Sequence, residues 1–454
     1  MSFLDDHYLL TSSAARELYD GVRDLPIIDP HNHADVAEIV RNQPWSDIWQ
    51  VEGATDHYVW ELMRRRGVSE ENITGSASNF DKWKALAGRF PEFAGNPTYE
   101  WIHLDLRRRF GIDRVISSHT AEEIWEETSA ALAAPRMRPQ SLLDEMRVEI
   151  MCTTDDPTLS LPFHDEARRT VRTTRILPTW RPDKAMNIEA PGWKSFVSRL
   201  GSRAGEDVST LSGLLAALAR SHAYFGELGC VAADHGLAEP VSRFVPESTA
   251  ADCLKTAWDG ATLLPEEIRD FKAFMLQRFG EFSRDAGWVM QLHVGPVRDF
   301  RTTLQRDLGP DSGGDISSHF IELAENLRYF LNEFDGRLKI VLYCVDPSHL
   351  PTFATLARAF PNVTLGAPWW WNDSPYGMET QLKYVATVDL LANHAGMVTD
   401  SRKLISFGSR TEMFRRILCE VLGGMIVRGQ IPESAASDLA RRLSFDRPRE
   451  LFFG

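Results

Sequence analysis

Short apolar or β-branched runs recur along the chain and alternate with segments of amphipathic helical pattern. Eight runs stand at residues 26–28, 148–153, 174–178, 229–233, 289–294, 339–345, 363–367 and 396–399. Helical patterns lie between them, for example at 320–334 and 350–360. Strands that alternate with helices are typical of a parallel α/β sheet, and eight such units predict a (β/α)8 TIM-type barrel.

Polar side chains follow nearly every run at its C-terminal end. They are His31, His33, Thr154, Asp155, Asp156, Trp180, Arg181, Asp234, His235, His293, Arg298, Asp346, residues 369–373, Asp400 and Arg402. Each one alone is compatible with a cap or a turn. Together they favour an active site, because the loops that follow the strands of a barrel form one rim, where barrel enzymes carry their chemistry.

A long stretch of helical pattern separates the first run from the second. It covers residues 34–147, with helical patterns at 56–67, 79–86, 98–110 and 121–134. Because it is far longer than an ordinary βα loop, it predicts a helical subdomain inserted after strand one, which acts as a lid. The predicted organisation is a first segment with strand one at 1–33, the insertion at 34–147, and the rest of the barrel at 148–454 with a helical excursion near 237–286.

Composition narrows the function. The 454 residues are 43% hydrophobic and 25% charged, which is ordinary for a globular protein. A net charge of −14 argues against nucleic-acid and anionic-membrane partners, since both require a basic face. No apolar run approaches membrane-spanning length and the N-terminus is acidic, which indicates a cytoplasmic location. The sequence leaves the oligomeric state open, a homo-oligomer included.

His31 and His33 are the first candidate metal ligands. Residues two apart on a strand point to the same side, so the two imidazoles can hold one divalent ion, although a His-x-His pair also occurs by chance. Asp400 follows the eighth run, which lies beside the first strand once a barrel closes, and it supplies a third ligand. His293 is a fourth ligand, a general acid or base, or a hydrogen-bonded barrel histidine. The fourth run contains no lysine that could bridge a second metal.

Three arginines and a tyrosine complete the candidate site. Arg181, Arg298 and Arg402 follow different runs, and a guanidinium group suits a carboxylate bidentately. One carboxylate-bearing substrate would account for all three, whereas the alternative pairs Arg181 with Asp183 and Arg402 with Asp400. Tyr58 belongs to the insertion and could reach the site as a proton donor. Its helical periodicity alone favours a packing residue.

Seven segments in combination resemble the uronate isomerase (glucuronate isomerase) family of the amidohydrolase superfamily, nearly from end to end. They are Asp29-Pro30-His31-Asn32-His33, Asp56-His57-Tyr58-Val59-Trp60, Gly95-Asn96-Pro97, Thr153-Thr154-Asp155-Asp156-Pro157, Trp180-Arg181-Pro182-Asp183-Lys184-Ala185, Trp369-Trp370-Trp371-Asn372-Asp373 and Gly396-Met397-Val398-Thr399-Asp400-Ser401-Arg402. The resemblance implies a zinc-type ion on His31, His33 and Asp400, with His293 beside it. It also implies that the sugar acid contacts a set of side chains made up of Tyr58, Asp234, Arg181, Arg298 and Arg402, to which we add Trp369.

The reaction implied by this resemblance is aldose–ketose isomerisation of a hexuronic acid. D-Glucuronate would interconvert with D-fructuronate, or D-galacturonate with D-tagaturonate, by proton transfer from C2 to C1 through an enediol. Asp400 is the first candidate for the base and Tyr58 the second, while His293 serves a hydroxyl. The arginines, Arg402 among them, stabilise the enediolate charge together with the metal.

Two other functions remain open on the sequence. A mononuclear metal-dependent amidohydrolase acting on an ester, lactone or amide of a carboxylated substrate would use the same metal, but hydrolysis itself does not require the three arginines and Tyr58. A sugar-acid binder without catalysis would not need the full set of metal ligands. The chain departs from the family pattern at Asp299-Phe300-Arg301, Gly313-Gly314 and Thr411, so the preferred uronate stays open.

Overall fold

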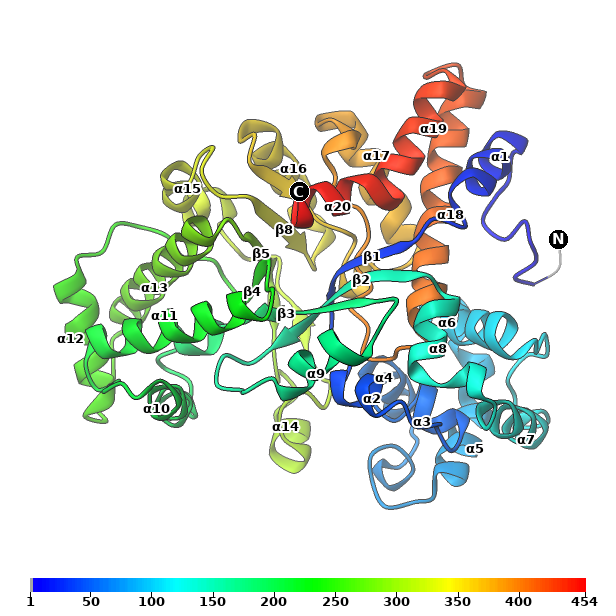
Figure 1. The fold of residues 1–454 in the computed structure, drawn as a ribbon, viewed down its shortest axis with the longest axis horizontal. Helices are drawn as coiled ribbons and strands as arrows, with labels where there is room; N and C mark the ends of the chain where they lie inside the picture. The colour runs from blue at the N-terminus through cyan, green and yellow to red at the C-terminus, as the bar shows by residue number, and fades with distance from the viewer. Residues whose placement is uncertain (1–2) are drawn as a thin grey trace.

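A parallel β-sheet forms the centre of the molecule. The computed structural model describes residues 3–454 (Figure 1). Its seven-stranded sheet has the order β1-β2-β3-β4-β5-β8-β9, so each strand lies beside the next strand of this sheet in chain order. The strands are β1 (Ile27–Asn32), β2 (Val148–Asp155), β3 (Arg175–Trp180), β4 (Ala232–Leu237), β5 (Val289–Val294), β8 (Ile340–Cys344) and β9 (Val363–Leu365). The fold is therefore α/β, as the alternating pattern predicts.

Helices surround this sheet and bury both of its faces, so β1 is buried at all six positions. The helices outside the β1–β2 connection are α1 (Ser13–Val22), α9 (Pro162–Thr170), α10 (Trp193–Ala204), α11 (Leu211–Glu227), α12 (Glu247–Trp258), α13 (Pro265–Ala286), α14 (Thr302–Leu308), α15 (Leu323–Glu333), α16 (Leu350–Ala359), α17 (Pro375–Val388), α18 (Ser406–Val427), α19 (Glu433–Arg441) and α20 (Arg447–Phe453). Within residues 3–454, no helix is long and apolar enough to cross a membrane.

Seven of the eight predicted runs coincide with strands of the sheet. The fourth run is displaced, because the chain turns at Gly229, where φ is +88°, and pairs only from Ala232 onward. Asp234 and His235 therefore lie inside β4, and the prediction that they follow the strand is wrong. A two-stranded antiparallel pair, β6 (Pro296–Val297) and β7 (Ile316–Ser317), was not predicted.

The eighth run, 396–399, is not a strand, yet it joins the two edges of the sheet. The amide of Ala395 donates to the carbonyl of Leu365 next to it on β9, and the amide of Asp400 donates to the carbonyl of His31 on β1. Gly396 and Asp400 have φ values of +87° and +48°. These left-handed residues bound the segment and interrupt regular extended pairing.

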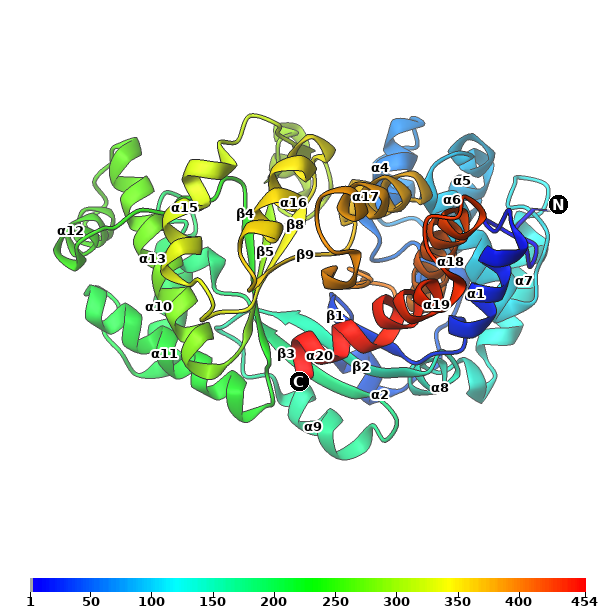
Figure 2. The same ribbon diagram turned by 90° about the horizontal axis from the view of Figure 1, so that it is seen from above.

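Seven α-helices lie between β1 and β2, and in both views most of them gather to one side of the sheet (Figures 1 and 2). They are α2 (Val36–Arg41), α3 (Ile48–Glu52), α4 (His57–Arg65), α5 (Asn79–Arg89), α6 (Pro97–Asp105), α7 (Ala121–Leu132) and α8 (Pro139–Glu145). The four predicted helical patterns of this stretch coincide with α4, α5, α6 and α7. A hydrophobic cluster of their own, which includes Val59, Trp83 and Ile102, packs these helices together.

Buried ion pairs bind these helices to the segment that follows residue 400. Nζ of Lys403 lies 2.9 Å from a carboxylate oxygen of Glu52 and 3.0 Å from one of Asp56. All three side chains are at most 4% exposed. We call these three residues the Lys403 network. It fixes α3 and the start of α4 against the chain beside Arg402, which positions the neighbouring side chains over the strand ends.

Candidate active site

A cavity of about 950 Å³ opens at the carboxyl ends of the strands. His31, His33, His293 and Asp400 line it together with all three arginines that the sequence singled out. Parallel strands bring their carboxyl ends to one rim, so residues hundreds of positions apart in the sequence meet here. The cavity is the place at which a substrate could reach the predicted metal ligands.

His31, His33 and Asp400 converge on one point of this cavity. Nε2 of His31 and Nε2 of His33 each lie 3.1 Å from the same oxygen, Oδ1 of Asp400. Two donors bound to one tetrahedral ion at bonds of about 2.1 Å lie roughly 3.4 Å apart, so the observed spacing fits a shared ion. The other oxygen of Asp400 accepts a hydrogen bond of 2.8 Å from Nε1 of Trp369, which fixes the carboxylate plane.

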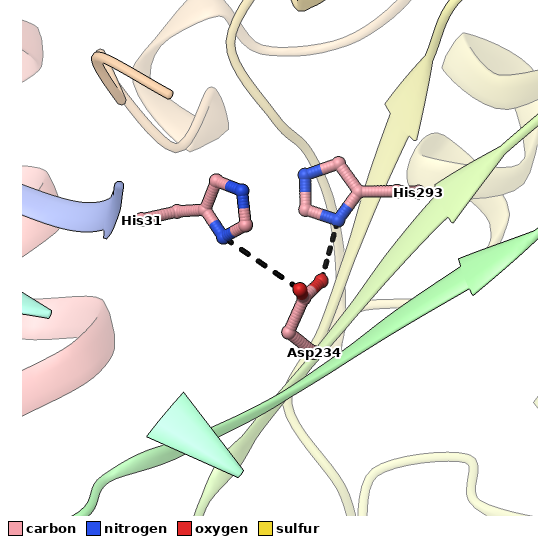
Figure 3. Close-up of side chains that lie close together, drawn as sticks. All are labelled: His31, Asp234 and His293. Carbon is pink, nitrogen blue, oxygen red and sulfur yellow. Dashed lines mark hydrogen bonds and ion pairs between the residues drawn. The ribbon is translucent and has the colours of Figure 1, made fainter. Parts of the chain in front are cut away.

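A second group shares His31 and lies deeper (Figure 3). Nδ1 of His293 lies 2.6 Å from Oδ1 of Asp234, and Nδ1 of His31 faces Oδ2 of Asp234 at 3.9 Å. All three side chains are buried. Because the Nδ1–H of His293 donates to Asp234, its Nε2 is left as an acceptor, and this buried atom has no hydrogen-bond partner. Asp234 therefore orients His293, and the free nitrogen is available for an ion or a substrate hydroxyl.

The charges of the site are set by burial and by neighbouring ions. Burial opposes ionisation of Asp234, but Arg181 and His293 outweigh it and hold the pKa of Asp234 well below its usual range. The pKa of Asp400 is likewise well below its usual range, because hydrogen bonds from His31 and His33 outweigh burial. Burial lowers the pKa of His293 to about 4. At neutral pH the site thus offers two carboxylates and a neutral His293.

Acidic side chains partner all three predicted substrate-binding arginines. Arg181 reaches Asp234 at 3.1 Å and also Asp183 at 3.2 Å, the local pair that the sequence left open. Nη1 of Arg298 lies 3.1 Å from Asp315, and its guanidinium carbon lies 4.2 Å from the centre of the Trp370 ring. Arg402 lies 3.8 Å from Asp311 and not in an ion pair with Asp400. Arg298 and Arg402 keep 40% and 28% of their side chains exposed, so both remain accessible from the cavity.

Tyr58 lies behind the cavity wall. Its ring stacks on His57 at 4.6 Å between centres and meets the edge of Trp101 at 5.8 Å. Among the described residues that line the cavity, His57 is present and Tyr58 is not. Burial raises the pKa of the Tyr58 hydroxyl well above its usual value, and the nearby Asp400 raises it further, so the hydroxyl keeps its proton.

Sequence reasoning missed the acidic partners of the arginines. Asp311 and Asp315 come from the segment between α14 and β7, and Asp315 also accepts a hydrogen bond of 2.7 Å from the amide of Asp299. Trp370 was noted only as part of a motif, although its ring supports Arg298 and its φ is +56°, which is unusual for so bulky a residue. The acidic residues and glycines of 309–315 were the available signal, because such a loop can present carboxylates to a rim.

The parallel sheet, the cavity at its strand ends and the histidine–aspartate groups define an α/β enzyme with a candidate metal site. The profile of the family described as "Glucuronate isomerase" matches residues 1–452. A uronate isomerase of Thermotoga neapolitana is 62% identical over 452 residues, covering 100% of both chains. The chain belongs to the glucuronate isomerase family, as its motifs predict.

Solved structures agree with this assignment. The chain is similar to the crystal structure of a uronate isomerase from Thermotoga maritima, with a TM-score of 0.98, 61% identity and 100% coverage of both chains. It is also similar to a glucuronate isomerase from Caulobacter crescentus, with a TM-score of 0.95 at 28% identity, covering 99% of this chain and 97% of that one. The near-complete coverage extends the similarity to the helices between β1 and β2.

Proposed function

We propose that the chain isomerises a hexuronic acid by C2-to-C1 proton transfer at a mononuclear metal site formed by His31, His33 and Asp400. Family membership makes the protein a uronate isomerase. The observation that carries the metal site is the convergence of the two imidazoles on one oxygen of Asp400, at 3.1 Å each. The substrates are D-glucuronate with D-fructuronate as product, or D-galacturonate with D-tagaturonate.

The fold that supports this site is a (β/α)8 barrel whose eighth member is the segment 396–399. Its hydrogen bonds to both sheet edges support this closure. Thr399 also bonds Asp29 of β1 twice, through its amide at 2.8 Å and its hydroxyl at 2.6 Å. We take residues 34–147 as an insertion that covers the rim, with 1–33 and 148–454 forming the barrel. The separate hydrophobic cluster of the inserted helices supports this division.

A divalent, zinc-type ion suits the donor set of two imidazoles and a carboxylate. When bound, it would stabilise negative charge on substrate oxygens. His293 is the candidate fourth ligand, since its unpartnered Nε2 lies beside His31, with the two rings 4.5 Å apart. The alternative role of His293 is to accept a proton from a substrate hydroxyl, for which its neutral state is equally suited.

Proton transfer is assigned to side chains near the metal group. Asp400 takes the C2 proton as a carboxylate. Tyr58 is the second candidate for proton transfer, but because its hydroxyl keeps its proton it can serve only as the donor to C1, and it accepts the C2 proton through Asp400 afterwards. A carboxylate with so low a pKa is a weak base, so the C2 proton must be acidified by charge on the neighbouring oxygen. Arg402 and Arg298 stabilise the enediolate or bind the C6 carboxylate, and Arg181 with Asp234 fixes the deep wall. Trp369, bonded to Asp400, completes the pocket.

Hydrolysis is the alternative use of the same metal group. Hydrolysis of a carboxylated substrate would also use two accessible arginines, Arg298 and Arg402, that face one cavity. The family is one of isomerases, however, and this favours isomerisation of a carboxylated sugar.

The experiment that tests the proposal is isomerisation in heavy water. Metal-loaded protein is incubated with D-glucuronate and with D-galacturonate, and NMR follows the 2-keto product and deuterium at C1 and C2. We expect the ketose to form, with partial deuteration at C1, because an enediol exchanges its mobile proton. Release of a hydrolysis product from an ester or lactone, with no ketose from either acid, would refute the proposal. Asp400→Asn is the matched inactive control.

A further inference from the structure

The cavity is larger than a hexuronate requires. Its volume of about 950 Å³ lies near the top of the range of roughly 300–1,000 Å³ that holds drug-sized ligands, which are considerably larger than one sugar acid. The metal group occupies one end. The other end is lined by Met186, Ala190, Ile268, Arg269 and Lys272, which belong to the loop after β3 and to α13. We call this second end the distal lobe. The lining of the cavity therefore extends from His57 of α4 to Ile268 of α13.

The charges of the distal lobe are balanced. Arg269 lies 3.1 Å from Glu239, Lys272 pairs with Glu189, and nearby Lys184 lies 3.3 Å from Asp156; all six of these residues line the cavity. Each of the three cations therefore has an acidic partner within 3.3 Å, whereas the carboxylate nearest to Arg402 lies 3.8 Å away. A site with paired charges does not select an anion, but it offers donors and acceptors to hydroxyl groups.

Apolar side chains lie among these ion pairs. Met186 and Ile268 line the distal lobe, together with Ala190 and its neighbour Pro191. A sugar ring presents hydroxyl groups at its edge and C–H groups on its faces, so a wall of mixed ion pairs and aliphatic groups is complementary to it. A second sugar without a charge matches this wall better than a second carboxylate does.

We propose that the distal lobe binds a neutral glycosyl group attached to the uronate, so that the enzyme also isomerises disaccharides with a uronic acid at the reducing end. This inference rests on the proposed function. The reaction itself uses C1 and C2, the arginines take the C6 carboxylate, and the C5 hydroxyl closes the sugar ring. The substituent is therefore carried on O3 or O4. The proton moves from C2 to C1 as in the free acid, and the glycosidic bond stays intact, so substrate and product are isomers.

The test compares free D-glucuronate with its 3-O-glucosyl and 4-O-glucosyl derivatives, with ketose formation followed by NMR. We expect the wild-type protein to convert at least one disaccharide with a kcat/KM within about tenfold of that for the free acid. Ala190→Trp fills the distal lobe from an exposed loop position, so folding should not suffer. In this variant, kcat/KM for the disaccharide should fall by about tenfold or more, while kcat/KM for free glucuronate should stay within about twofold of the wild-type value.

Two further variants sharpen the result. Ile268→Trp fills the distal lobe from α13 and should act as Ala190→Trp does. Leu264→Trp, at the N-terminal end of the same helix, is the matched control, because Leu264 is 65% exposed and does not line the cavity; it should change neither rate.

Each outcome is decisive. If free glucuronate is isomerised while neither disaccharide is converted or competes with it, the distal lobe is not a sugar subsite and the proposed function stands. If the tryptophan variants convert a disaccharide as well as the wild type does, the substituent lies elsewhere and the assignment fails. If neither free D-glucuronate nor free D-galacturonate is converted, the proposed function itself fails.

Discussion

Two clusters of buried charge lie three residues apart at Asp400 and Lys403, yet their surroundings differ. Asp400 opens onto the cavity and shares one oxygen between two imidazoles. The Lys403 network does not line the cavity, and its lysine lies between a carboxylate of α3 and one at the start of α4. Burial of charge alone therefore does not identify a reactive site. Access from the cavity, together with a free nitrogen such as Nε2 of His293, does.

The two clusters should also respond differently to substitution. A metal group leaves donor atoms available for a ligand, so its variants should lose function before stability. A closed network uses its charges to hold segments together, so its variants should lose stability first, because removal of one partner leaves the other charges buried without compensation.

The largest effect is expected at the metal group. His31→Ala, His33→Ala and Asp400→Asn each remove a donor from a site with few others, so bound metal and turnover should fall together, most strongly for turnover in Asp400→Asn. Loss of turnover by about 10³-fold or more is expected there. Metal analysis of the purified proteins beside steady-state rates checks this. If all three variants bound as much metal as the wild type, the proposed metal site would be contradicted.

Lys403→Met should have the opposite effect: the protein should lose stability but keep its bound metal. It leaves Glu52 and Asp56 buried without their cation, which costs about 3–5 kcal/mol of unfolding free energy. The folded fraction should still bind metal, since Lys403 does not line the cavity. Urea unfolding and metal analysis measure the two quantities. A variant of normal stability that had lost its metal would erase the distinction between the two clusters.

Substitution of the arginines tests whether the part of the cavity near Asp400 binds a carboxylate. Arg402→Lys and Arg298→Lys keep the charge but lose the planar two-pronged contact, so kcat/KM should fall by about 10²-fold. Neutral aldoses should be poor substrates for the same reason. Equal turnover of glucose and glucuronate by the wild type would contradict the assignment. Glu239→Gln, which alters the distal lobe, is the matched control and should leave free glucuronate unaffected.

Tyr58→Phe distinguishes a role of the Tyr58 hydroxyl in proton transfer from a role of its ring in packing. The ring and its stacking on His57 remain, while the hydroxyl is lost, so the melting temperature should barely change. Turnover should fall by about 10²-fold if the hydroxyl relays a proton. Thermal melts beside kinetics distinguish the two roles. Full activity would make Tyr58 a packing residue and leave Asp400 with His293.

The smallest effect concerns a buried carboxylate that has neither metal nor cation. Burial raises the pKa of Asp155 to about 7, whereas an unfolded aspartate titrates near 3.9. The folded state therefore binds the proton more tightly, so this stability is complete below about pH 3.9 and is lost as the pH rises through 7. Between pH 5 and pH 8 the wild type should lose on the order of 2 kcal/mol more unfolding free energy than Asp155→Asn does. Equal pH dependence in both proteins would contradict this.

Local pattern was enough for most of the fold. A strand buried on both faces needs a continuous apolar run, so seven strands were visible in the sequence. Helices α4 to α7 were visible because their apolar positions repeat with helical spacing. The register of β4 was not, since the turn at Gly229 decides where pairing begins. The apolar composition of the segment 396–399 predicts a strand, whereas the left-handed residues Gly396 and Asp400 at its ends prevent regular pairing.

The motifs in the sequence were enough to predict the family, and they also named the three residues that converge at Asp400. His31 and His33 share a side because they stand two apart on one strand, and Asp400 joins them because a run before it borders that strand. The ionic partners of these side chains became visible only in the folded chain. They are Asp234 for His293, Asp311 for Arg402, Asp315 for Arg298, and Glu52 and Asp56 for Lys403. The two members of each pair come from different segments of the chain. Sequence patterns report only on residues a few positions apart, so they could not predict these pairs. Charge pairing acts through space, so the packing of helices on the sheet had to place the partners.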